Sequence, residues 1–319
     1  MNTEPEKKNI GTPYDDAFRT MLVDCIRLVI PVINEVFGKN YIGTEDIIQH
    51  PNEHFIIQQD DEEKRITDGN FTIRGTKDET YLFECQSMPD SSMLIRIWEY
   101  IVQIAMERGT VEKNRMIVRI PNAAVLYLRS TSTTPDVMDI VVEAPTGSLS
   151  FPVPVMKIKN YSLDAIFGKK LYFLLPFYIF THEGEFESHQ MDAEWLDRLR
   201  EEYVNIRTLL DEAVQNGLMP YHYRATIIEM TKKVVENIAV RYERIREGVN
   251  EIMGGQVLEY ESKTIFKEGV EQGRQEGRQE GIEMMVIKLY NSGMSIDKIA
   301  EIADVPVNIV KQWIEVHTA

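Results

Sequence analysis

The sequence predicts a mixed α/β core followed by an α-helical C-terminal extension. Three observations predict this fold class: an N-terminal segment with helical spacing of apolar residues, two adjacent β-prone segments, and a helical pattern from Ser188 onward. The chain has 319 residues, of which 43% are hydrophobic and 27% are charged. This composition supports a large core and excludes a wholly disordered chain.

The first predicted helix spans residues 14–37. Its apolar side chains recur every three or four residues, so they form one stripe along the helix. Thr12 followed by Pro13 is a helix-start signal, and Gly38 is a stop signal. Residues 1–12 are polar and carry no such pattern.

Two segments, 66–74 and 80–86, are predicted as neighbouring strands of a central sheet. Both are rich in β-branched and aromatic residues, and the polar residues 75–79 between them favour a hairpin turn. A helix over 91–108 is predicted next, with a serine at its start and a glycine after its end. The helices 14–37 and 91–108 are expected to flank the sheet. Further short strands are predicted at 116–120, 124–128, 138–143 and 151–158.

The C-terminal half is predicted to be helical over 186–261, with long amphipathic helices at 194–216 and 221–248. Residues 262–283 carry a glycine every four residues among Glu, Gln and Arg. Each glycine costs a helix about 1 kcal/mol relative to alanine. The segment is therefore either a flexible linker or a helix whose glycine row packs against a partner helix. A second copy of the chain is one such partner, which would make the protein a homo-oligomer.

Residues 284–319 form a separate small helical pattern. Ser295 is a suitable cap for the helix that follows it, and a second helix is expected over 308–316. This spacing resembles a helix-turn-helix. The tail has more acids than bases from Ile296 onward, so a small protein-contact module explains it equally well.

Charge and motif content exclude several classes of protein. The net charge is −16, but residues 108–170 carry nine Lys/Arg against five Asp/Glu, so a local basic region remains available to a nucleic acid. The sequence has no P-loop or dinucleotide-binding glycine motif and no zinc-site spacing of histidines, so no nucleotide cofactor is expected. Its two cysteines, the lack of a secretory signal and the lack of a long apolar run predict a cytoplasmic protein without a membrane span.

The predicted hairpin carries the residues with the clearest chemistry. Side chains alternate across a strand, so Glu84 and Gln86 share one face while Cys85 points to the other. Asp68 stands at the head of the preceding strand, and a hairpin brings it beside Glu84. Two carboxylates and a backbone carbonyl form an oxygen-rich site suited to Mg²⁺. Taken singly, Asp68 with Gly69 is also an ordinary turn pair.

Five segments together resemble the recombination-promoting nuclease/transposase family of the PD-(D/E)xK superfamily. Residues 15–19 (DDAFR) are similar to its D-x-x-F-[KR], and 64–68 (KRITD) to its basic residue followed by a metal-binding Asp. Residues 84–86 (ECQ) resemble its E-x-Q form of the (D/E)xK element, and 96–100 (RIWEY) its R-x-x-x-Y. Residues 171–178 (LYFLLPFY) also resemble a segment of that family. The resemblance covers about residues 10–185 and implies a nuclease-like domain over 1–185 with a restriction-endonuclease-like core.

The resemblance implies a role for individual residues. Asp68 and Glu84 would be metal ligands, with the carbonyl of Cys85 as a third, and Asp15 would be an outer acidic residue. Gln86 stands where the superfamily usually has a lysine, and its neutral amide orients water only by hydrogen bonds.

The resemblance also implies that Arg96 and Tyr100, which share a helix face, bind the substrate. Simpler interpretations remain open for some of these residues. Asp15 is also a favourable first-turn acid, and Arg96 and Tyr100 are also an ordinary pair on a core helix.

The implied function is a DNA endonuclease that uses Mg²⁺ or Mn²⁺ to hydrolyse phosphodiester bonds in recombination or transposition. The alternative is a catalytically weak or inactive factor that binds DNA or protein and self-associates through its C-terminal tail. The acidic charge, Gln86 and the helix-turn-helix-like tail favour that alternative.

Overall fold

The structure is a computed structural model that describes residues 12–50, 53–58, 61–90, 92–254, 282, 285–290, 293–303 and 305–318. It divides the chain into two compact units, 1–255 and 256–319. Within the described residues, no helix has the length and apolar character that a membrane span requires. The predicted glycine-rich segment 262–283 lies outside the described residues, except for Ile282.

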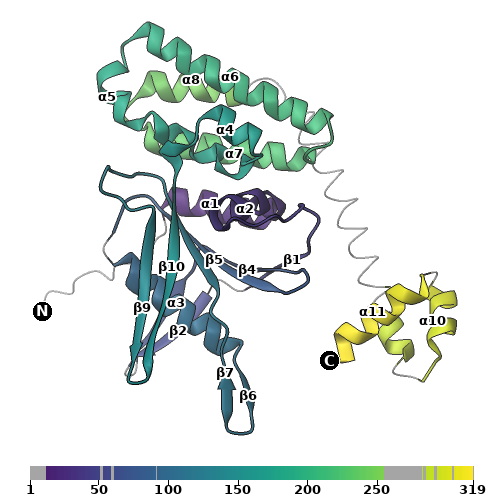
Figure 1. Cartoon of the computed structure of the whole chain (residues 1–319). Coiled ribbons are helices and arrows are strands. Elements are labelled where there is room, and N and C mark those ends of the chain that lie inside the picture. The colour runs from purple at the N-terminus through teal and green to yellow at the C-terminus, as the bar shows by residue number, and fades with distance from the viewer. Residues whose placement is uncertain are drawn as a thin grey trace, which may run out of the picture. The chain divides into compact units, whose positions relative to one another are not determined.

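The first unit contains a mixed sheet of six strands flanked by helices, so the predicted α/β class is confirmed (Figure 1). The strand order is β1-β4-β5-β8-β10-β9; β5, β8 and β10 run parallel, and the other pairings are antiparallel. The strands are β1 (Ile47–Gln49), β4 (Gly69–Ile73), β5 (Glu79–Gln86), β8 (Asn122–Tyr127), β9 (Val137–Ala144) and β10 (Gly147–Lys157). The predicted hairpin is present as β4–β5, and Gly69 pairs with Phe83.

Two short antiparallel ribbons lie outside this sheet. One is formed by β2 (Glu53–Gln58) and β3 (Asp61–Ile66), and the other by β6 (Thr110–Glu112) and β7 (Arg115–Ile117). The predicted strand 66–74 is therefore shorter than expected, because Ile66 belongs to β3 and the chain turns at Thr67 and Asp68. This turn ends the β4–β5 ladder next to Asp68.

One face of the sheet is covered by α1 (Pro13–Asp24) and α2 (Val29–Phe37), which the 3₁₀ turn η1 (Ile26–Leu28) separates. A single helix over 14–37 was expected, and the difference has a local cause. Pro31 has no N–H to donate to residue 27, and its ring crowds that carbonyl, so the helix is interrupted one turn earlier. The buried side chains of α1 and α2 join the largest core cluster that the described residues form.

The other face is covered by α3 (Met93–Glu107), which packs on a second core cluster that includes Leu82 and Val125. Ser92 precedes the helix as predicted, but its hydroxyl donates to Asp90 and does not cap the helix. Arg96 near the start of α3 contacts Gln86, and Arg108 just after its end contacts Thr80. The helix therefore lies along β5 in the antiparallel direction.

A helical layer covers α1 and α2 on their far side (Figure 1). Its long helices are α6 (Ala193–Gln215), α7 (Tyr221–Ile238) and α8 (Glu243–Gly254), preceded by η2 (Ile158–Asn160), α4 (Leu163–Gly168), the buried 3₁₀ segment η3 (Tyr172–Thr181), η4 (Glu183–Glu185) and α5 (Phe186–His189). The predicted helix 221–248 is two helices, because the chain turns at Ala239–Tyr242. This turn places the Tyr242 ring 5.3 Å from that of Phe186.

The second unit has its own small core. Residues 285–290, α10 (Ile296–Ala303) and α11 (Val307–Thr318) are helical, which agrees with the predicted pattern of the tail. Ile299, Val310 and Val286 are buried together in this core. Ser295 precedes α10 as predicted, and its carbonyl accepts the first helical hydrogen bonds from Lys298 and Ile299.

Candidate functional site

The β4–β5 hairpin has one apolar face and one polar face. Phe71, Tyr81, Phe83 and Cys85 join the core beneath α1 and α2. The alternate positions face α3, and there the chain places Asn70, Thr72, Thr80, Glu84 and Gln86 beside the single apolar residue Leu82. The polar face therefore follows directly from the alternation of side chains along two strands.

The hairpin brings Asp68 and Glu84 together at the end of this face. Since Gly69 pairs with Phe83, the next position places Asp68 opposite Glu84. The Asp68 N–H donates to Glu84 Oε1 over 3.2 Å, and the Cys85 N–H donates to Asp68 Oδ2 over 3.1 Å. Both side chains are buried, with 4% of each residue exposed. The pair is thus a carboxyl cluster held at both ends by backbone donors.

Arg19 of α1 completes the cluster. Its Nε and Nη2 atoms both donate to Asp68 Oδ1, over 3.1 and 2.8 Å. Arg19 belongs to the 15–19 segment that resembles the nuclease family, but no role was predicted for it. Its spacing of four residues from Asp15 on one helix was the signal available, because both side chains then face the same neighbour.

Asp15 lies in the first turn of α1 and forms a capping box with Thr12. Its Oδ2 accepts from the Thr12 N–H over 2.6 Å, and its own N–H donates to Thr12 Oγ1 over 3.3 Å. Its negative charge still acts on the cluster, since it contributes to the raised pKa of Asp68. The favourable first-turn role considered for Asp15 is therefore present, and an electrostatic influence on Asp68 accompanies it.

Burial shifts the protonation of the two carboxyl groups upward. Desolvation raises the pKa of Asp68 to about 6, although the Arg19 charge opposes this shift. The pKa of Glu84 is raised well above its usual range, first by desolvation and then by the neighbouring Asp68. Two buried carboxyl groups that resist ionisation together form a site where an added positive charge would bind favourably.

Gln86 and Arg96 lie beside the cluster and interact. Arg96 Nη2 donates to Gln86 Oε1 over 3.2 Å and to Asp90 Oδ2 over 3.3 Å. Because arginine has no acceptor atom, the Gln86 atom facing it is the carbonyl oxygen, and the amide NH₂ points elsewhere. The Arg96 charge also lowers the pKa of Glu84. These two predicted residues are thus brought to the carboxyl pair.

The side chains of two other predicted residues are buried away from the carboxyl pair. Tyr100 shares the helix face of Arg96 but is 5% exposed and packs in the core cluster under α3. Its predicted role in substrate binding is therefore not supported by its placement. The Cys85 side chain is buried on the opposite face, where desolvation raises the pKa of its thiol, so it is a poor nucleophile.

The donor set of the site suits a hard divalent cation. Carboxylate oxygens of Asp68 and Glu84 are of the type that Mg²⁺ prefers, and the Cys85 carbonyl lies on the strand edge that faces Asp68, because its N–H donates there. Among the described residues, no group of three or more His, Cys, Asp or Glu side chains is placed to hold a metal. The predicted set has only two such side chains, so this result does not count against it.

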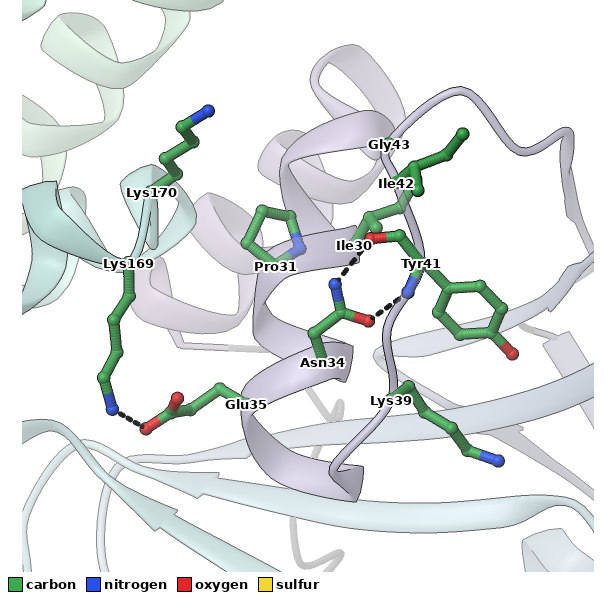
Figure 2. A pocket seen from close by; sticks show the side chains of 10 residues that line it. All are labelled: Ile30, Pro31, Asn34, Glu35, Lys39, Tyr41, Ile42, Gly43, Lys169 and Lys170. Atoms are coloured by element: carbon green, nitrogen blue, oxygen red, sulfur yellow. Dashed lines mark hydrogen bonds and ion pairs between the residues drawn. The ribbon is translucent and has the colours of Figure 1, made fainter.

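A cavity in the described part of the chain lies away from this site. It has a volume of about 420 Å³ and is formed by α2, the loop 39–43 and Lys169 and Lys170 (Figure 2). Lys169 pairs with Glu35 over 2.6 Å, and the Asn34 side chain bonds to the backbone of Tyr41. None of the predicted site residues lines this cavity.

Comparison of the chain with protein families, with curated proteins and with solved structures finds no match.

Proposed function

We propose that this chain is a Mg²⁺-dependent DNA endonuclease with a restriction-endonuclease-like core, acting in recombination or transposition. The observation that carries the proposal is the buried pair of Asp68 and Glu84 joined at the end of the β4–β5 hairpin. Their order and spacing also match the nuclease family that the sequence resembles. Mn²⁺ is expected to replace Mg²⁺, because it accepts the same oxygen ligands.

The electrostatics of the pair support a cation. Arg19 places one positive charge on Asp68, yet the pKa of both carboxyl groups remains raised. A divalent ion held by Asp68, Glu84 and the Cys85 carbonyl would favour the ionised form of both. When bound, such an ion polarises a phosphoryl oxygen and lowers the pKa of water.

Gln86 and Arg96 together compensate for the missing lysine. Arg96 donates to the Gln86 carbonyl, so the Gln86 NH₂ is the group left to donate to water or to a phosphoryl oxygen. The Arg96 charge lies directly behind that amide and polarises it. The oxygen of a water molecule would bond to phosphorus and release a proton to solvent, while one bridging P–O bond breaks and the departing oxygen takes up a proton from solvent.

Nicking of supercoiled plasmid with Mg²⁺ or Mn²⁺ tests the proposal. Asp68→Asn and Glu84→Gln preserve size and should each lower the nicking rate by about 100-fold or more, because charge stabilisation at such sites is worth several kcal/mol. Chelation of the metal should lower the wild-type rate as far. The matched control is Asp78→Asn, which removes the same charge from an exposed position of the same hairpin.

Two results would contradict the proposal. One is an equal nicking rate in the wild type and in both site variants. The other is the absence of nicking by the folded wild type with either metal. Circular dichroism and thermal unfolding of each variant show whether a lost activity reflects the site or a lost fold.

A second function is favoured by one specific observation, the contact of Arg19 with Asp68. In a non-catalytic DNA- or protein-binding factor, the guanidinium would hold this carboxylate in place of a metal. Such a cytoplasmic factor would self-associate through its C-terminal tail. A chain ending at residue 261 would then lose oligomerisation and binding, whereas the endonuclease would keep its nicking activity.

A further inference from the structure

A second polar cluster lies on the α3-facing side of the same hairpin, at the opposite end from Asp68 and Glu84. Arg108 Nη1 donates to Thr72 Oγ1 over 2.9 Å and to Thr80 Oγ1 over 2.5 Å. The two hydroxyl oxygens are 3.0 Å apart, and His50 Nε2 lies 2.8 Å from that of Thr72. Cross-strand pairing of Thr72 with Thr80 holds the two hydroxyls side by side.

Arg108 has no carboxylate partner among the described residues, although it is partly buried. Its hydrogen bonds to described residues all come from Nη1 and go to the two threonines, so Nε and Nη2 donate to no described side chain. Desolvation lowers the pKa of Arg108, although the charge of the adjacent Glu107 opposes this shift. A guanidinium with unused donors and no ion-paired carboxylate among the described residues is a suitable receptor for an anion such as a phosphate.

His50 contributes a neutral ring to this cluster. Burial and the nearby Arg108 charge lower the pKa of His50 to about 4. The imidazole is therefore uncharged at neutral pH, and Arg108 supplies the positive charge. The cluster would attract an anion through one guanidinium and orient it with hydroxyl and ring groups.

Asn70 lies between the two clusters and is unsatisfied. It occupies the position between Asp68 and Thr72 on the polar face of β4, and 4% of it is exposed. Its Oδ1 is buried and has no hydrogen-bond partner among the described residues. Since buried acceptors are almost always satisfied, this atom indicates a ligand that brings its own donor. A nucleobase or a sugar hydroxyl carries such a donor next to a phosphate.

The spacing of the two clusters fits a polynucleotide strand. Asp68 and Thr72 are four positions apart on one strand, as are Glu84 and Thr80, so the clusters are separated by about 13 Å at ~3.3 Å per residue. One strand of a nucleic acid rises about 3.4 Å per nucleotide. The distance therefore corresponds to about four nucleotides.

We propose that Arg108, Thr72 and Thr80 bind a backbone phosphate of the nucleic-acid strand about four nucleotides from the cleaved bond, while Asn70 accepts a hydrogen bond from the strand between them. The identity of the ligand rests on the proposed function, since the cleaved bond is placed at Asp68 and Glu84. A purely structural Arg108, which only ties the end of α3 to the hairpin, is the contrary explanation.

Fluorescence anisotropy of labelled oligonucleotides without divalent metal tests this site without any reaction. Arg108→Gln should weaken binding of a 12-nucleotide strand about tenfold and should reduce the salt dependence by about one phosphate contact. The matched control Arg74→Gln removes the same charge from an exposed position at the end of β4 and should change the affinity about twofold or less. Strands shorter than about four nucleotides should bind Arg108→Gln and the wild type with the same affinity.

Two further measurements keep the test decisive if Arg108→Gln does not fold. Arg108→Lys keeps the positive charge but loses the paired donors of the planar guanidinium. This variant should bind the 12-nucleotide strand about three- to fivefold more weakly and keep the salt dependence. Competition by inorganic phosphate is the second measurement. If phosphate displaces a mononucleotide and a 12-mer equally well, the site binds a free anion, and the polynucleotide assignment is overturned.

Equal affinity of the wild type, Arg108→Gln and Arg108→Lys would overturn the proposal, as would no binding by the wild type. Nicking that depends on Asp68 would then still support the proposed function. Conversely, Arg108→Gln could lose binding while the wild type shows no nicking. That result would support the phosphate site and contradict the proposed endonuclease activity.

Discussion

The two faces of the β4–β5 hairpin both contain buried residues but differ in chemistry. On the face beneath α1 and α2, Phe71 and Phe83 are almost fully buried in apolar surroundings. On the face toward α3, Asp68, Asn70 and Glu84 are each 4% exposed, and all three are polar. Burial alone therefore does not determine which residues occupy these strands.

The apolar face stabilises the fold, whereas the polar face is where we propose that a ligand binds. Burial of an apolar ring stabilises the native state, whereas a buried polar group stabilises it only when its partners are present. Asp68 and Glu84 have raised pKa values, Asn70 lacks a partner for Oδ1, and Arg108 lacks a carboxylate among the described residues. Asn70 Oδ1 and the Arg108 guanidinium on the polar face thus keep hydrogen-bonding capacity that no described residue uses.

Truncation of the apolar face should have the largest effect on stability. Phe83→Ala removes a ring that lies 5.4 Å from the ring of Phe18 in the main core, and we expect it to lower the free energy of unfolding by about 3–5 kcal/mol. Urea unfolding monitored by circular dichroism measures the change. Phe151→Ala, on a half-buried ring stacked on Trp98, is the control and should cost less. An equal cost for both would show that the cost does not depend on how deeply the ring is buried.

The pH dependence of stability should reveal the carboxyl pair. The folded pKa values of Asp68 and Glu84 lie above their unfolded values, so the native state binds protons more tightly than the unfolded chain. Without metal, the free energy of unfolding should therefore fall as pH rises from about 4 to above 6, by about 3 kcal/mol in this window.

Urea unfolding at several pH values, compared with the double variant Asp68→Asn with Glu84→Gln, checks this prediction. The double variant should lose most of the fall, while Asp78→Asn should retain it. A wild type that becomes more stable over the same window would show that the pair is ionised without a metal.

Addition of a divalent metal should stabilise the ionised form of the carboxyl pair and therefore the folded protein. Binding to the native state alone stabilises by about 2.7 kcal/mol at a metal concentration 100-fold above Kd. We expect Mg²⁺ or Mn²⁺ at that level to raise Tm by about 5–10 °C in the wild type. Asp68→Asn and Glu84→Gln should remove this rise. An identical rise in Asp68→Asn would place the metal elsewhere.

The features of the site that depend on residues close together in the sequence could be predicted. Asp68 and Glu84 meet because a short hairpin and the alternation of side chains fix their register. The contact of Arg19 with Asp68 spans 49 positions and depends on where α1 packs, which no local pattern encodes. The interruption of the first helix was missed because the apolar stripe continues through it, although Pro31 marked the place.

The remaining member of the polar face, Asn70, gives the smallest and most direct test of the contrast. Its Oδ1 makes no hydrogen bond to the described residues, so replacement by a similarly shaped apolar group removes a buried unsatisfied oxygen. Asn70→Leu should therefore raise the free energy of unfolding by about 1 kcal/mol, measured by urea unfolding. The same variant should weaken binding of a 12-nucleotide strand, because the acceptor is lost.

Asn122→Leu is the matched control for this variant. The Asn122 amide donates to Glu79 and to the Thr80 carbonyl, both over 3.4 Å, so its removal should destabilise the protein and leave binding unchanged. If Asn70→Leu instead destabilises the protein as much as Asn122→Leu does, the Asn70 oxygen has a structural partner. The polar face would then be satisfied by the fold itself, and its burial would need no ligand to explain it.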